Sequence, residues 1–225
     1  MKSGSEQLER FLEAGWVMRI LVATLAVYLL LSVILGILWS SEPEPFLVSQ
    51  VAAQHAEQNN TTVTTGYTTT VALMTVTQTL LDKSGGYLSN DVFPPGMWLD
   101  NIPRWEFGVL VQVRDLSRAM RKDFSRSQSQ STEDLDLAIA EPQFHFDNSS
   151  WALPDTEGEY RRGIDKLNAY ILRLADTNSR QSQFYARSDN LRTWLKDVET
   201  RLGSLSQRLS ASVGQKRINI DLAGD

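Results

Sequence analysis

The residues of this chain best suited to acid–base chemistry lie in one acidic stretch, formed by Glu133, Asp134, Asp136 and Glu141. Paired carboxylates can act as general acid and base, and clustered ones can bind calcium. The spacing here does not match a calcium-binding loop. A simpler explanation is that acidic side chains at the start of a helix interact favourably with the positive end of its dipole. A cell-wall hydrolase that uses Asp100, Glu133 and Glu141 is therefore the third of three functional hypotheses.

Other reactive groups are scarce. The chain has no cysteine, which excludes disulfides, thiolate metal sites and a cysteine nucleophile, and its two histidines are His55 and His145. His145 lies between two phenylalanines and before Asp147, where a packed, hydrogen-bonded histidine is a simpler interpretation than a metal ligand or base. Phosphate-loop, nucleophile-elbow and zinc-protease motifs do not occur. We therefore predict no catalytic residue, no cofactor and no metal.

One segment indicates where the chain works. Residues 20–39 carry no charged side chain. A helix of this length spans about 30 Å, the thickness of the hydrocarbon core of a bilayer. Trp16 and Trp39 bracket the segment, as interfacial anchors do. A cleaved signal peptide has a shorter apolar region and a small-x-small cleavage site, so we predict an uncleaved transmembrane helix.

The distribution of charge predicts the orientation of this helix. Lys2, Arg10 and Arg19 precede it, whereas no Lys or Arg follows it until Lys83. Because basic residues stay on the cytoplasmic side, the N-terminus should be cytoplasmic. This predicts a single-pass protein of the bacterial inner membrane whose bulk is periplasmic. The expected parts are a short cytoplasmic tail (1–19), the transmembrane helix (20–39), a Pro-containing stalk (40–45), a periplasmic helical domain (46–213) and a C-terminal tail (214–225).

Apolar residues recur at helical spacing along most of the outer region. The predicted fold is all-α: a single N-terminal transmembrane helix plus a periplasmic antiparallel helical bundle with long irregular loops. Thr156-x-x-Glu159 reads as a capping box, and the short turn at 176–178 makes the last two helices antiparallel neighbours. Helices are expected over residues 46–58, 71–83, 100–124, 132–142, 156–176 and 179–213.

Residues 87–103 form an apolar loop without periodicity. It contains three prolines, so it must be held against other parts of the fold. It either caps one end of the helices or presents aromatic side chains to a partner. A pocket lined by Tyr87, Trp98, Trp105 and Trp151 would favour a ligand. The candidate interaction surface comprises Tyr87, Phe93, Met97, Trp98, Trp105 and Trp151.

The last predicted helix carries a coiled-coil seam. Its apolar residues alternate four and three positions apart, which calls for another helix against them, from the same bundle or from a second chain. The helix over 100–124 has a basic side that includes Arg114, Arg118 and Arg121. That side is either solvated and paired with carboxylates or binds an anionic polymer. The seam consists of Leu191, Leu195, Val198, Leu202, Leu205 and Leu209.

Three long runs make the chain similar to a known family: residues 85–134, 140–154 and 201–215. They resemble an uncharacterised family of proteobacterial inner-membrane proteins, defined by a domain of unknown function. The resemblance implies an envelope protein with one N-terminal anchor, and a further helical segment after Gly214 and Gln215. It implies no activity, substrate or catalytic residue.

These observations leave three functional hypotheses in order of preference. The first is a non-enzymatic, membrane-anchored scaffold or adaptor in a cell-envelope assembly, with the lipid bilayer and a protein partner or second copy as its contacts. The second is a periplasmic sensor or binding module for a small molecule or glycan, and the third is the hydrolase. The net charge of −5 argues against a nucleic-acid partner.

Overall fold

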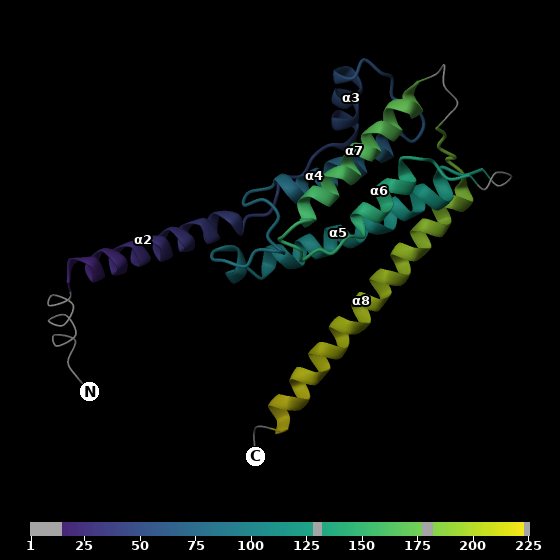
Figure 1. The fold of residues 1–225 in the computed structure, drawn as a ribbon. Helices are drawn as coiled ribbons and strands as arrows, with labels where there is room; N and C mark the ends of the chain where they lie inside the picture. Colours follow the sequence, from purple (N-terminus) through teal and green to yellow (C-terminus); the bar gives the residue numbers. More distant parts are fainter. Residues whose placement is uncertain (1–14, 128–131, 177–181, 223–225) are drawn as a thin grey trace.

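The computed structural model describes residues 15–127, 132–176 and 182–222. These ranges hold helices and no strand, which confirms the all-α prediction (Figure 1). The predicted cytoplasmic tail lies largely outside them, as do residues 177 and 178 of the predicted turn. The helices are α2 (Trp16–Trp39), α3 (Val48–Gln58), α4 (Tyr67–Asp82), the 3-10 turn η1 (Gly96–Trp98), α5 (Asn101–Ala119), its π-helical continuation η2 (Met120–Phe124), α6 (Leu137–Phe144), α7 (Thr156–Ala175) and α8 (Ser188–Leu222).

The apolar N-terminal segment is a single helix, α2, that projects from one end of the bundle (Figure 1). It begins at Trp16, earlier than the predicted start at Ile20. Its side chains are mostly exposed, and it alone among the described helices is long and apolar enough to cross a membrane. The predicted stalk is irregular chain, and α3 begins at Val48.

The core lies between α4, α5, α6 and α7, with α3 packed on α4. On α7 the buried residues Tyr160, Leu167 and Ile171 follow the spacing of a helix with one apolar face. Gly163 allows α6 to approach α7 closely, because a Cβ atom there would lie 2.5 Å from the ring of Phe144. The buried residues of this core therefore come from all the helices between α3 and α7.

The structure corrects two helix boundaries near α6. The acidic helix begins at Leu137 rather than Thr132, because the Asp134 carboxylate accepts hydrogen bonds from the backbone N–H groups of Asp136 and Leu137. Pro142 does not end this helix, which continues to Phe144. At the end of the helix, Arg114 of α5 donates to the carbonyl of Phe144 at 2.7 Å, which satisfies one of the carbonyls that the last turn leaves free.

The cap of α7 also differs from the prediction. Asp155 is the N-cap residue, and its carboxylate accepts a hydrogen bond of 3.0 Å from the backbone N–H of Gly158. The Thr156 hydroxyl donates instead to the carbonyls of Asp147 and Ser150. The predicted capping box is therefore not formed: the N-cap lies one residue earlier, Gly158 stands at N3, and the hydroxyl of Thr156 bonds to the preceding loop.

The predicted antiparallel pairing of the last two helices is wrong. Helix α8 begins at Ser188, and its neighbour is α5 rather than α7 (Figure 1). The cause is Phe184, whose ring stacks on that of Phe124 at 5.0 Å and packs over Gly66, a glycine with φ of 89°. This contact fixes the chain at the far end of α5. Helix α8 then runs to Leu222, so most of the predicted C-terminal tail is helical.

Candidate interaction surfaces

A buried ion pair fixes the beginning of the apolar loop. Glu106, on α5, is fully buried, and its carboxylate accepts hydrogen bonds of 2.8 Å from the backbone N–H groups of both Leu88 and Ser89. The Lys83 ammonium group donates to the same carboxylate and to the carbonyl of Leu80. Desolvation lowers the pKa of Lys83, while its hydrogen bond to Glu106 opposes that effect. The loop therefore leaves α4 in a fixed direction.

The last residue of α2 packs against this same turn. Gly85 and Gly86 have φ values of 86° and 71°, the left-handed conformation that ends α4. A Cβ atom on Gly85 would lie 2.7 Å from the indole of Trp39, so only glycine accommodates the ring there. The end of α2 is thus seated on the bundle.

The loop also follows α2 toward its middle. The Tyr28 hydroxyl donates a hydrogen bond of 3.0 Å to the carbonyl of Pro94. Nearer the bundle, Pro95 lies 3.7 Å from the position of a Cβ atom on Gly36, and Ser32 of α2 is buried. Figure 1 shows the loop between α4 and α5 beside the end of α2. Sequence reasoning missed this contact.

Four of the six predicted surface residues are exposed. Phe93 is 73% exposed and Trp98 is 50% exposed, and Met97 and Trp151 are exposed as well. Of the other two, Tyr87 is buried and Trp105 is half-buried. The hydroxyl of the buried Tyr87 donates a hydrogen bond of 3.0 Å to the carbonyl of Asn148. Trp105 packs on the core, with the Lys83 ammonium 5.9 Å from its ring centre.

A cavity of about 520 Å³ lies between the end of α2 and two loops. Its walls include Trp39, Phe93 and Trp151, but not Tyr87, Trp98 or Trp105, so the four aromatic residues whose common pocket would favour a ligand do not line this cavity together. Leu153, also in its wall, is 96% exposed. The sequence signal that could have identified Leu153 is an apolar residue next to a proline in an irregular segment.

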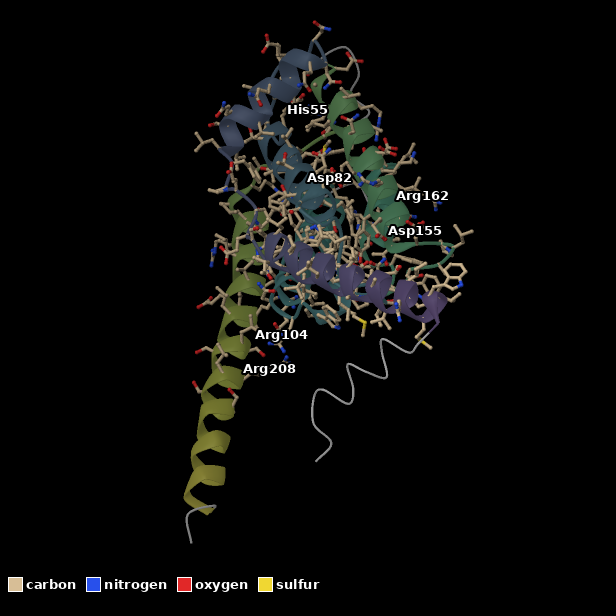
Figure 2. All side chains as sticks on the ribbon, turned by 90° about the vertical axis from the view of Figure 1, so that its left-hand side faces the viewer. His55, Asp82, Arg104, Asp155, Arg162 and Arg208 are labelled. Atoms are coloured by element: carbon tan, nitrogen blue, oxygen red, sulfur yellow. The ribbon has the colours of Figure 1, made fainter. Side chains whose placement is uncertain are left out.

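The seam of α8 lies largely in the open. Leu191, Leu195, Leu202, Leu205 and Leu209 are all exposed, the last to 68%. Val198 is half-buried. Figure 2 shows α8 extending well beyond the bundle, with Arg208 on the projecting part. The described bundle does not cover these leucines.

The start of α8 is better packed. Arg201 forms an ion pair of 2.5 Å with Asp115 of α5. A second cavity, of about 450 Å³, lies between α5 and this part of α8, where Phe124, Phe184 and Trp194 contribute to its wall. The two ends of α8 therefore differ, since the first turns meet the bundle and the later turns do not.

The carboxylates considered for catalysis are engaged in ion pairs. Arg121 contacts both Glu133 and Glu141 at 2.7 Å. Asp100 lies 3.5 Å from Arg104 on the surface. The basic side of α5 is thus paired with acids at Arg121. Among the described residues no group of three His, Asp or Glu side chains is placed to hold a metal ion.

Both histidines make hydrogen bonds within the fold. His55 of α3 contacts the Tyr67 hydroxyl at 2.8 Å and the Asn168 side chain at 3.1 Å, which ties α3 to α4 and α7 (Figure 2). His145 lies 2.7 Å from the guanidinium of Arg118. His145 is therefore hydrogen-bonded, as the sequence favoured, but it is exposed rather than packed.

Comparison with known proteins gives a match at the level of the family. A family model described as an uncharacterized protein conserved in bacteria matches residues 12–225. No curated protein and no solved structure matches the chain. The match covers α2, the bundle and α8 together.

Proposed function

The chain belongs to DUF2333, the family of uncharacterized bacterial proteins, and on this premise we propose that it is a membrane-anchored scaffold or adaptor in a cell-envelope assembly. In this proposal α2 crosses the inner membrane with its N-terminus in the cytoplasm, and the bundle stands in the periplasm. The protein is non-enzymatic and acts by bringing a partner to the membrane surface.

The exposed seam on α8 is the single observation that carries this proposal. A helix whose leucines alternate four and three positions apart is suited to pack against another helix by knobs into holes. On α8 the described bundle leaves these leucines exposed, from Leu202 to Leu209 in particular. Exposure of such a stripe to water is unfavourable, because the burial of each apolar side chain lowers the free energy. A partner helix, from another protein or from a second copy, would cover it.

The anchor and its orientation rest on charge and composition. Helix α2 has an apolar surface and tryptophans at both ends, Trp16 and Trp39. Arg19 lies near its N-terminal end, and acidic Glu42 and Glu44 follow its C-terminal end. This asymmetry supports a cytoplasmic N-terminus and a periplasmic bundle.

The seam can be tested in the full chain. Aspartate at both Leu195 and Leu202 should abolish the assembly while the bundle stays folded, because both side chains are exposed. The matched control carries aspartate at Thr193 and Thr200, which have the same seven-residue separation and are also exposed. Crosslinking in native membranes reports complex size, and circular dichroism of the purified chain reports folding. Unchanged complex size in the leucine variant would contradict the proposal.

A second candidate function, ligand binding, is favoured by the cavity beside α5. Its volume of about 450 Å³ lies within the range of small-molecule sites. Its wall combines Phe124, Phe184 and Trp194 with the charged side chain of Arg187, so an apolar molecule carrying an acidic group fits it best. Quenching of tryptophan fluorescence by cell-wall fragments or fatty acids, lost in Trp194→Phe, would support this function over the scaffold.

A further inference from the structure

We propose that residues 92–99 are inserted into the outer leaflet of the membrane beside α2, and that lipid chains cover their exposed side chains. This inference rests on the proposed function, because it takes α2 to be the membrane anchor. It assigns the bundle a second attachment to lipid besides its single helix. The argument depends on depth, on hydrogen bonding and on a neighbouring apolar loop.

The depth of the loop follows from its contact with Tyr28. This residue lies about three helical turns, or about 16 Å, before the end of α2 at Trp39. Tryptophan marks the headgroup level, and half of a hydrocarbon core is about 15 Å. The carbonyl of Pro94 bonds to the Tyr28 hydroxyl, so the tip of the loop reaches the hydrophobic interior of the leaflet.

The exposed side chains of the loop are those that lipid accepts. Val92, Phe93, Met97 and Trp98 are all exposed, and all are apolar or aromatic. Charged residues lie only at the flanks, where Asp91 precedes the loop and Asp100 follows it. The pattern of an apolar centre between charged ends is typical of a segment that enters a membrane from the interface.

Several backbone groups at the tip of the loop bond within the protein, which favours placing them in lipid. Pro94 and Pro95 have no N–H to satisfy. The N–H groups of Met97, Trp98 and Leu99 donate to the carbonyls of Phe93, Pro95 and Gly96, at 3.0 to 3.2 Å. The carbonyl of Pro94, at the tip of the loop, accepts from the Tyr28 hydroxyl.

A second loop lies next to the first at the same end of the molecule. Trp151 and Leu153 line one cavity together with Phe93 and with Trp39, the headgroup marker of α2. Leu153 is almost fully exposed in the described structure. An interfacial position explains both residues, because tryptophan prefers the headgroup region and leucine the acyl chains below it. Residues 92–99 and residues 151–153 therefore form one continuous lipid-facing surface around the end of α2.

The absence of cysteine makes this inference testable with single labels. Phe93→Cys, Trp98→Cys and Leu153→Cys variants of the full chain are labelled with the fluorophore NBD. They are reconstituted into vesicles of phosphatidylethanolamine and phosphatidylglycerol that include a lipid with brominated acyl chains. Leu30→Cys on the exposed side of α2 reports the anchor, and Val63→Cys, in the exposed turn between α3 and α4, reports water. Circular dichroism confirms that each labelled variant is folded.

The expected result is strong bromolipid quenching at positions 93 and 98, within about twofold of that at position 30, and none at position 63. Position 153 should be quenched by bromines near the headgroups. Quenching at position 30 with none at 93 and 98 would overturn the inserted loop while leaving the anchor intact, and would point to a protein partner for this surface. No quenching at position 30 would overturn the anchor and the inserted loop together.

Discussion

The Tyr28 hydroxyl, near the middle of the apolar helix α2, bonds to the carbonyl of Pro94 at 3.0 Å, although the two residues lie 66 positions apart in the sequence. Together with the packing of Trp39 on Gly85, this contact makes α2 part of the folded structure rather than a flexibly linked anchor. The bundle, and α8 with it, is consequently held in a defined orientation relative to α2.

Removing the Tyr28 hydroxyl should weaken this attachment. In Tyr28→Phe the carbonyl of Pro94 loses its donor, and in the lipid interior, where the proposed insertion places it, an unsatisfied polar group costs about 1–3 kcal/mol. We expect a lower thermal midpoint for the chain in lipid nanodiscs. Tyr185→Phe is the matched control, because its exposed hydroxyl contacts only the Gln183 side chain. Equal midpoints for the two variants would contradict a structural role for the bond.

The ion pair between Lys83 and Glu106 should be the most sensitive polar site of the bundle. Glu106→Gln leaves the buried Lys83 without its counter-charge, and breaking such a pair costs about 3–5 kcal/mol. Denaturant unfolding followed by circular dichroism measures the loss. Asp100→Asn, which breaks an exposed pair with Arg104, should change stability by less than about 1 kcal/mol. A small loss in Glu106→Gln would show that the loop does not depend on this pair.

The carboxyl group of Asp91 should make stability depend on pH. Desolvation raises its pKa above the ordinary value of 3.8, and the charges of Glu157 and Glu106 raise it further, while Lys83 opposes them. The folded chain therefore binds this proton more tightly than the unfolded chain does, so stability falls as pH rises from 3.8 through the folded pKa. Asp91→Asn should raise the thermal midpoint at pH 7 and lose that advantage near pH 4. A gain that is the same at both pH values would exclude this origin.

Two glycines should respond in opposite ways to alanine. Gly163→Ala places a methyl group 2.5 Å from the Phe144 ring and should destabilise the bundle by about 1–3 kcal/mol. Gly203→Ala on α8 meets no atom within 4 Å and should stabilise the helix by about 0.5–1 kcal/mol. Thermal unfolding of the two variants checks the contrast. A loss of stability at Gly203 would place a neighbour against that side of α8.

The sequence predicted most helices because their apolar residues repeat at local spacing, as on α7 from Tyr160 to Ile171. Contacts between segments that are distant in the sequence produce no such local pattern. Periodicity could not reveal that Phe184 fixes the start of α8 beside Phe124, so the pairing of the last two helices was predicted wrongly. For the same reason Tyr87 was assigned to the surface, whereas the bonds of Glu106 with Lys83, Leu88 and Ser89 hold the start of the loop in the core.

The exposed residues of the loop were predicted better. Phe93, Met97 and Trp98 lie in an apolar stretch that the prolines keep out of helices, and all three are exposed. The sequence did not indicate that the loop packs against α2. The hydrogen bond between Tyr28 and Pro94 depends on how α4 and α5 direct the loop back along α2.

The scaffold role of α8 is tested most directly by crosslinking in native membranes. Leu202→Cys places a thiol on the seam, and Thr200→Cys places one on the exposed side away from it, in a chain with no other cysteine. With a short photoactivatable crosslinker attached to the thiol, we expect a product of higher mass from position 202, from a second copy or from a partner, and little from position 200. Equal yields at the two positions, or none at either, would contradict the assignment of the seam as the contact of an assembly.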